Sequence, residues 1–262
     1  MAKYLAIILL ILFCYNVRAQ SWEVGGFAGG SGYMGDLNPN NPLKVSGIAA
    51  GGFIKRNING YVSIRAGYTY GKISAADSTS GGNQQFRDRN LSFTTRLSEI
   101  SLTGEFNFLK YIPSVSHDIY TPFIYAGIGY TAYNPQANYQ GKTYDLRPLT
   151  TEGQSTPYPN STIVAPFGVG IKYNVAGRLS LIADLGYRVA FTDYLDDVSG
   201  VYVDKSNLSG VVAKALSDRS GEKTGIYTGS AGTQRGDLRK RDTYLFVGFS
   251  ISYTFITPKC YF

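Results

Sequence analysis

Histidine, cysteine and methionine are scarce in this chain of 262 residues, and their scarcity narrows the functions that the chain can perform. The single histidine, His117, stands beside Asp118, but adjacent positions in a sequence do not have the geometry of a catalytic triad. Nucleophile-elbow, zinc-protease, paired-cysteine and phosphate-loop motifs are all missing. Outer-membrane phospholipase or protease activity would need a nucleophile with a histidine base, and only His117 is available, so the sequence predicts a protein that is not an enzyme and has no cofactor.

Long apolar runs are also missing, apart from one near the start of the chain. Residues 5–13 form an apolar run of roughly ten residues, which is too short to cross a bilayer as a helix. A lysine precedes this run and Val17 and Ala19 follow it, in the pattern of a secretory signal peptide that is cleaved after Ala19. We therefore expect a signal peptide over residues 1–19. Cys14 offers the alternative of a lipoprotein signal, but a phenylalanine precedes it where such signals require a small residue.

Cysteine becomes even scarcer once the signal peptide is removed. The mature chain then contains one cysteine, Cys260, which has no partner for a disulfide within the chain. In an oxidising compartment, an odd cysteine indicates either an intermolecular disulfide or a free thiol. The sequence leaves both alternatives open for Cys260.

Charged residues are few and scattered. Removing Lys3 and Arg18 with the signal peptide lowers the formal net charge by two, from +7 to +5. Polybasic stretches of the kind that bind nucleic acid are missing, so a nucleic-acid partner is not expected. One basic cluster precedes the end of the chain, and it is either a solvated loop or a contact for anionic lipid headgroups. The cluster consists of Arg235, Arg239, Lys240 and Arg241.

Tyrosine, glycine and phenylalanine are abundant, and they occur in segments that alternate with period two. In residues 243–255, large apolar side chains fall on odd positions from Leu245, and small or hydroxylated ones fall on even positions from Gly248. This alternation separates a lipid face from a lumen face, as in a transmembrane β-strand. The expected strands are 22–34, 44–55, 61–73, 91–109, 120–133, 163–173, 179–191 and 243–255. Within 91–109, Leu97 and Ile100 both look outward-facing, so we expect a β-bulge near Ser98.

The connections between these strands alternate in length. Those after the second and sixth strands are tight, whereas those after the third, fifth and seventh are long, the last covering residues 192–241. Outer-membrane barrels have short periplasmic turns and longer extracellular loops. We therefore expect an all-β fold: an eight-stranded antiparallel transmembrane β-barrel over residues 20–255, with a periplasmic tail over residues 256–262.

Charges of both signs occupy positions that face the lumen of this expected barrel. An eight-stranded barrel is only wide enough for side chains to fill it, and buried charges must be paired. The pattern therefore predicts a lumen that is closed by ion pairs, and it argues against a wide pore. The expected lumen residues are Arg65, Glu99, Glu105, Lys172, Asp184 and Arg188.

An acidic segment begins the longest loop, with carboxylates at Asp193, Asp196, Asp197 and Asp204. Carboxylates at this density are typical calcium ligands, but their spacing does not match the twelve-residue calcium loop, so no metal site is assigned. The segment is alternatively a turn in which aspartates cap backbone N–H groups, or a recognition loop on the extracellular rim.

Three elements of the sequence together resemble a known family. They are Trp22-Glu23-Val24-Gly25-Gly26 with Gly35-Asp36-Leu37-Asn38-Pro39, Thr192-Asp193-Tyr194-Leu195-Asp196-Asp197-Val198-Ser199, and a last strand whose tail contains Cys260 and ends in Tyr261-Phe262. The chain resembles the PorG-type outer-membrane barrels of the Bacteroidetes type IX secretion system and the wider barrel family around them. The resemblance covers essentially the whole mature chain.

The resemblance implies a non-enzymatic component embedded among the lipids of the outer membrane. PorG-type barrels associate with a periplasmic ring of the lipoprotein PorK and the protein PorN, which they are thought to tether or position. We therefore expect a disulfide from Cys260 to such a ring lipoprotein, within a partner-binding tail. The other expected tail residues are Pro258, Lys259, Tyr261 and Phe262. The alternatives are a small porin and a surface-recognition barrel.

Overall fold

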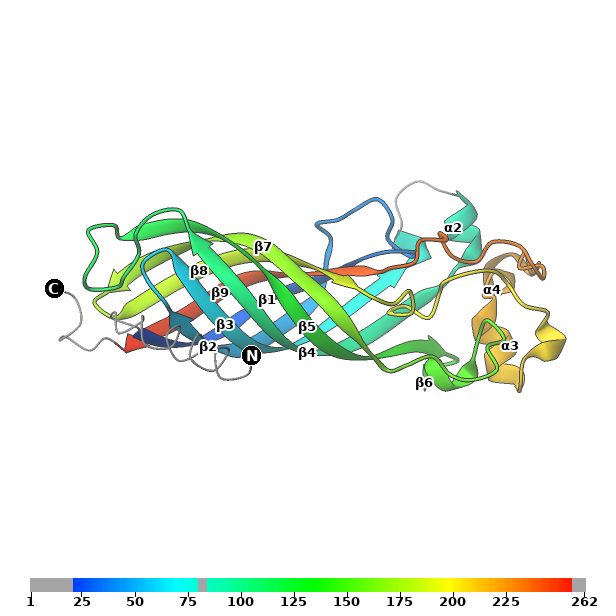
Figure 1. Cartoon of the computed structure of the whole chain (residues 1–262). Coiled ribbons are helices and arrows are strands. Elements are labelled where there is room, and N and C mark those ends of the chain that lie inside the picture. The colour runs from blue at the N-terminus through cyan, green and yellow to red at the C-terminus, as the bar shows by residue number, and fades with distance from the viewer. Residues whose placement is uncertain (1–20, 80–83, 256–262) are drawn as a thin grey trace, which may run out of the picture.

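The structure, a computed structural model, describes residues 21–79 and 84–255. Antiparallel strands dominate this part of the chain, and short helices lie in the longer connections (Figure 1). The strands are β1 (Ser21–Met34), β2 (Val45–Asn57), β3 (Val62–Ala76), β4 (Ser92–Asn107), β5 (Tyr120–Tyr139), β6 (Lys142–Asp145), β7 (Ser161–Ala176), β8 (Leu179–Ala190) and β9 (Thr243–Phe255). The helices are η1 (Asp77–Thr79), α2 (Gln84–Arg89), η2 (Arg147–Leu149), η3 (Lys205–Asn207), α3 (Val211–Ser217) and α4 (Gly221–Thr224).

Eight of these strands close into a barrel. Neighbouring strands follow the order β4-β3-β2-β1-β9-β8-β7-β5, and a further β4–β5 pairing joins the two ends of the sheet. Every pair is antiparallel, and β1 meets β9 along thirteen residue pairs from Trp22↔Phe255 to Met34↔Thr243. The expected eight-stranded antiparallel barrel is confirmed. The additional β6 forms a hairpin with an extension of β5, outside the closed ring.

The two ends of the barrel differ (Figure 1). One end carries the β2–β3, β4–β5 and β7–β8 connections, the start of β1 and the end of β9, and we call it the short-turn end. The other end carries the β1–β2, β3–β4, β5–β7 and β8–β9 connections, and we call it the long-loop end. At the short-turn end, Asn59 closes the β2–β3 turn because its Oδ1 accepts hydrogen bonds from the backbone N–H groups of Tyr61 and Val62, both at 2.8 Å.

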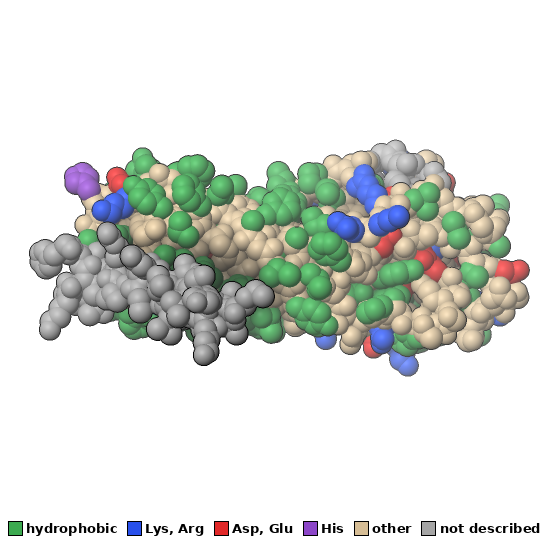
Figure 2. All heavy atoms as spheres, in the orientation of Figure 1, with side chains coloured by type: hydrophobic (Ala, Val, Ile, Leu, Met, Phe, Trp, Pro, Cys, Tyr) green, Lys and Arg blue, Asp and Glu red, His purple; other side chains and the backbone are tan. Residues whose placement is uncertain are grey.

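Alternation along the strands sorts side chains between the outside and the lumen. On β9, Phe249 and Ile251 are exposed, while Ser250 and Ser252 are buried. Hydrophobic side chains are spread over the part of the barrel surface that Figure 2 shows, and the charged side chains in view lie toward the two ends of the molecule. An apolar outer surface of this extent is what lipid requires of a barrel that spans a membrane.

The expected β-bulge near Ser98 was wrong. The β3–β4 pairing continues without a shift of register from Val62↔Phe106 to Ala76↔Ser92. Ile100 faces out and is 66% exposed, whereas Leu97 faces in and is fully buried. The reason is that the barrel interior becomes apolar toward the long-loop end. There, Leu97 belongs to a buried hydrophobic cluster that also contains Phe93 and Phe246.

Candidate functional site

The lumen near the short-turn end is organised around Glu105 of β4. Glu105 is only 3% exposed, and three cations, from β2, β3 and β7, surround its carboxylate. Lys172 Nζ lies 2.6 Å from its Oε2, Lys55 Nζ lies 3.3 Å away, and Arg65 Nη1 lies 3.7 Å from Oε1. Lys55 is shared with Glu23 of β1, at 2.8 Å. Glu105 is thus the anionic centre of a network that ties five strands together.

A second group of charges lies in the lumen nearer the long-loop end. Glu99 forms an ion pair with Arg188 at 3.3 Å and accepts a hydrogen bond from the hydroxyl of Tyr244 at 2.7 Å. Asp184 accepts a hydrogen bond from the Tyr125 hydroxyl at 3.4 Å. The structure therefore places all six predicted lumen residues inside the barrel, in or beside one of these two groups.

Glu23 and Lys55 belong to the first network but were missing from the prediction. The burial pattern of β1 shows the signal that was available, because Glu23 stands between the outward-facing Trp22 and Val24. Lys55 follows Phe53, which also faces the lumen, so the alternation in β2 puts an aromatic and a cation on the same side. An aromatic residue facing in made that strand difficult to orient from the sequence.

Little free space remains between the two groups of charges. The cavity there has a volume of about 20 Å³, which is room for about one water molecule. Its lining includes Phe27, Arg65, Thr103, Tyr125, Asp184 and Arg188. Beyond it, the hydrophobic cluster around Leu97 and Phe246 fills the barrel toward the long-loop end. Side chains therefore close the part of the lumen that the structure describes.

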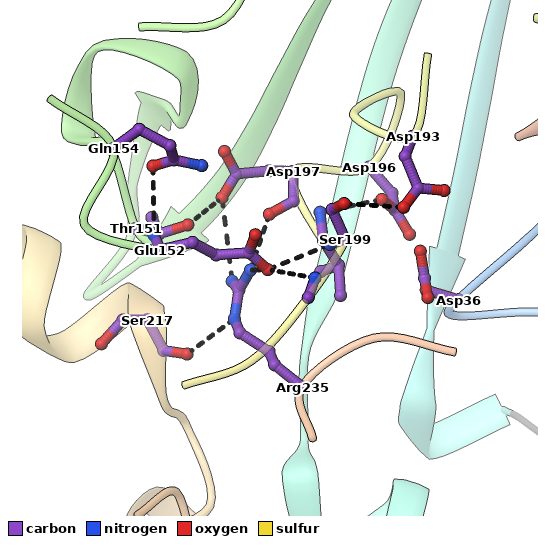
Figure 3. A network of polar contacts seen from close by, with 12 residues as sticks. Asp36, Thr151, Glu152, Gln154, Asp193, Asp196, Asp197, Ser199, Ser217 and Arg235 are labelled. Atoms are coloured by element: carbon purple, nitrogen blue, oxygen red, sulfur yellow. Dashed lines mark hydrogen bonds and ion pairs between the residues drawn. The ribbon is translucent and has the colours of Figure 1, made fainter. Parts of the chain in front are cut away.

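At the long-loop end, Arg235 joins the β5–β7 connection to two other segments of its own β8–β9 connection (Figure 3). Its guanidinium donates to Glu152 Oε1 at 2.8 Å, to the carbonyl oxygen of Asp197 at 2.7 Å and to that of Ser217 at 3.1 Å. Glu152 Oε1 also accepts from the backbone N–H groups of Ser199 and Gly200, at 3.0 and 3.2 Å. The expectation that Arg235 lies in a solvated or lipid-contacting cluster was wrong, because this side chain is buried and fully engaged.

The acidic segment has three buried carboxylates and one exposed one. Asp197 accepts hydrogen bonds from the hydroxyls of Thr151 at 2.5 Å and Tyr158 at 2.7 Å. Burial raises the pKa of Asp197 to about 6, against the lowering effect of Arg235. Asp204 alone faces solvent, and its Oδ1 caps the N–H of Ser206 at 2.8 Å. Asp193, Asp196 and Asp197 therefore stabilise the folded loops from within and do not present a carboxylate surface to a partner.

One further group of carboxylates is suited to hold a cation. Asp36, Asp193 and Asp242 are buried, and each offers an oxygen that lies within 4.8 Å of those of the other two. They come from the β1–β2 connection and from the two ends of the β8–β9 connection. The sequence prediction covered only Asp193 of these three.

The predicted partner-binding tail lies outside the described residues, and so does the predicted signal peptide. Nothing in the structure therefore tests Cys260, Pro258, Lys259, Tyr261 or Phe262. The described chain ends with Phe255 of β9, at the short-turn end. His117 is exposed in the β4–β5 connection at the same end.

Among the residues that the structure describes, none of the helices is long and apolar enough to span a membrane. The closed sheet of eight strands, its apolar outer face and a lumen filled by charged and hydrophobic side chains define an integral membrane β-barrel of the outer-membrane type. The chain belongs to the DUF6089 family, described as a domain of unknown function, whose model matches residues 2–212. No curated protein matches the chain in sequence.

Solved structures with a similar shape are bacterial outer-membrane proteins. The N-terminal β-barrel domain of Pseudomonas aeruginosa OprF is 13% identical, with a TM-score of 0.39, and the match covers 90% of this chain and 97% of that one. Neisserial surface protein A is 10% identical, with a TM-score of 0.40 and the same coverage. A major outer membrane protein from Thermus thermophilus is 15% identical, with a TM-score of 0.43, covering 91% and 100%. The fold assignment depends on the strand pairing of this chain and not on these likenesses.

Proposed function

We propose that this protein is a non-enzymatic outer-membrane component of a type IX secretion machine, which anchors or positions a periplasmic ring. The ring would contain a PorK-like lipoprotein and a PorN-like protein. The observation that carries the proposal is the closed lumen, in which two charge networks and a hydrophobic cluster leave a cavity of only about 20 Å³. A barrel filled in this way is a rigid anchor rather than a conduit, and the resemblance to PorG-type barrels supplies the partner.

The short-turn end is the proposed docking side. Short turns face the periplasm in outer-membrane barrels, and Phe255, the last residue of β9, lies at the short-turn end of this barrel. Residues 256–262 continue from that point, and they include Cys260. In the oxidising periplasm, we propose that the thiol of Cys260 forms a disulfide with a cysteine of the ring lipoprotein. The remaining tail residues would contact the same partner.

Electrophoresis of native membranes without reductant tests the disulfide. Wild-type protein should migrate in a high-mass species that reductant converts to the monomer, and Cys260→Ser should abolish this species. Cys14→Ser is the matched control, because cleavage of the signal peptide would remove that residue and leave the pattern unchanged. A high-mass pattern that survives Cys260→Ser would refute the covalent link.

Affinity purification from detergent-solubilised outer membranes tests the anchor itself. Co-purification of periplasmic ring proteins with the wild-type barrel is the expected result. Their absence from repeated purifications, with the barrel intact, would refute the proposed function even if Cys260 were oxidised. A small porin is the first alternative and predicts steady ion conductance in planar bilayers, whereas the filled lumen predicts none.

A surface-recognition barrel is the second alternative, and one observation favours it. A groove of about 470 Å³ opens at the long-loop end, and aromatic and basic side chains line it. Tyr158 stacks on Tyr194 with ring centroids 4.4 Å apart, and Arg239 and Lys240 line the same groove. Recovery of an extracellular ligand without ring proteins in the affinity purification would support this alternative and oppose the anchor.

A further inference from the structure

The buried carboxylates at the long-loop end lack an obvious source of positive charge. Asp36, Asp193, Asp196 and Asp242 lie together there, and Figure 3 shows the first three facing a common space. Burial, together with the neighbouring carboxyls of Asp237 and Asp193, raises the pKa of Asp36 to about 8. Ionised carboxylates packed this closely need either protons or a cation.

Neutral groups donate the hydrogen bonds that these carboxylates accept. The hydroxyl of Tyr33 lies 2.6 Å from Asp196 Oδ2 and 2.9 Å from Asp242 Oδ1, so one proton is shared between two acids. Asp193 accepts from the Ser199 hydroxyl at 2.7 Å. Further donors are the backbone N–H groups of Leu195, Val198 and Asp237. Hydrogen bonds of this kind orient the carboxylates but do not neutralise them.

The guanidinium that contacts Asp36 is already paired with another carboxylate. Arg89 donates to the backbone carbonyl of Asp36 at 3.0 Å, but its charge is matched by the carboxylate of Asp77, at 2.7 and 2.8 Å. It lowers the pKa of Asp36 only as a smaller influence than burial. When these carboxyls are ionised, they therefore carry negative charge that Arg89 does not balance.

An unsatisfied oxygen points to a missing ligand. Asp36 is 1% exposed, and within the described residues its Oδ2 accepts no hydrogen bond. An orphaned buried carboxylate oxygen costs free energy unless a proton, a water molecule or an ion completes it. This oxygen belongs to one of the three aspartates that converge on a common point.

We infer that Asp36, Asp193 and Asp242 form a binding site for one divalent cation, and that its occupant is calcium. Three oxygens within 4.8 Å of one another place an ion at their centre no more than about 2.8 Å from each, close to the roughly 2.3–2.6 Å of Ca–O bonds. Magnesium demands shorter bonds and near-ideal octahedral geometry. The ligands are all hard carboxylate oxygens, which suit calcium rather than zinc or copper.

The positions of the three ligands give the ion a structural role. Asp193 and Asp242 flank the long β8–β9 connection, and Asp36 lies in the β1–β2 connection. A bound ion therefore links both ends of the β8–β9 connection to the β1–β2 connection. This role is independent of the proposed anchoring function, since it concerns the opposite end of the molecule.

Calcium binding to the purified full-length barrel in detergent tests the inference. After EGTA treatment and buffer exchange, isothermal titration with CaCl₂ should give one site per chain. Asp36→Asn and Asp242→Asn should each weaken binding by about tenfold or more, because each removes a charged ligand. Asp204→Asn is the matched control, since this exposed aspartate of the same loop should leave binding unchanged.

Limited proteolysis of the wild-type protein keeps the test independent of how the variants fold. Calcium should protect residues 193–242 from cleavage relative to EGTA, whereas equimolar magnesium should not. Absence of calcium binding by the folded wild-type barrel would overturn the inference, as would equal affinities in the wild type and the Asp36→Asn variant. Equal cleavage with and without calcium would overturn it as well.

Discussion

Removal of the negative charge at Glu105 should destabilise the barrel strongly. Glu105→Gln keeps the shape of the side chain but leaves Lys172, Lys55 and Arg65 facing one another without their shared anion. At the 2.6 Å separation from Lys172, a unit charge pair is worth about 6 kcal/mol at an effective dielectric constant of about 20. Desolvation offsets much of this attraction, so the net loss for a broken buried pair is roughly 3–5 kcal/mol.

Equilibrium unfolding in urea, with the barrel folded in lipid vesicles, measures this loss directly. Glu222→Gln is the matched control: Glu222 pairs with Arg219 at 2.8 Å but is partly exposed, so the change should cost roughly 0–1 kcal/mol. A second substitution, Lys172→Met, should recover part of the stability lost in Glu105→Gln, because it removes one of the uncompensated cations. A Glu105→Gln variant that unfolds within about 1 kcal/mol of the wild type would refute the view that the network is held by charge.

Two further predictions concern the long-loop end. Arg235→Met leaves the buried Glu152 without its cation, so residues 193–242 should be cleaved faster in limited proteolysis while the barrel core stays resistant. Arg239→Met, at an exposed arginine of the same loop, serves as the control. Equal cleavage rates in Arg235→Met and the wild type would contradict the role of Arg235. The pKa values of Asp36 and Asp193 are raised from 3.8 to about 8 and about 6, chiefly by burial. The folded protein therefore holds protons that the unfolded chain has released, and in EGTA its stability should fall as pH rises from 4 to 8. Thermal unfolding across this range checks the sign, calcium should flatten the dependence, and a rise of stability with pH in EGTA would contradict the argument.

Much of the barrel was predictable because alternation is a local property. Successive side chains of a strand point to opposite faces of the sheet, so Ser250 and Ile251 could be assigned to the lumen and the lipid face without knowing which strands pair. The prediction failed where the lumen changes character. Leu97 is apolar and faces in, because the interior near the long-loop end is a hydrophobic cluster, and local hydrophobicity cannot distinguish that interior from lipid.

The sequence by itself determined the eight strands, the outward and inward sets of residues on most of them, the distribution of short and long connections, and the charged character of the lumen. Only the tertiary structure decided which charges meet, because closure of the sheet brings Lys55 of β2 and Lys172 of β7 to the same carboxylate of β4. The tertiary structure also decided which side chains of the loops come together. Asp36, Asp193 and Asp242 are far apart along the chain and come together only when the loops fold over the barrel. A local sequence pattern cannot indicate that such distant residues are close in space.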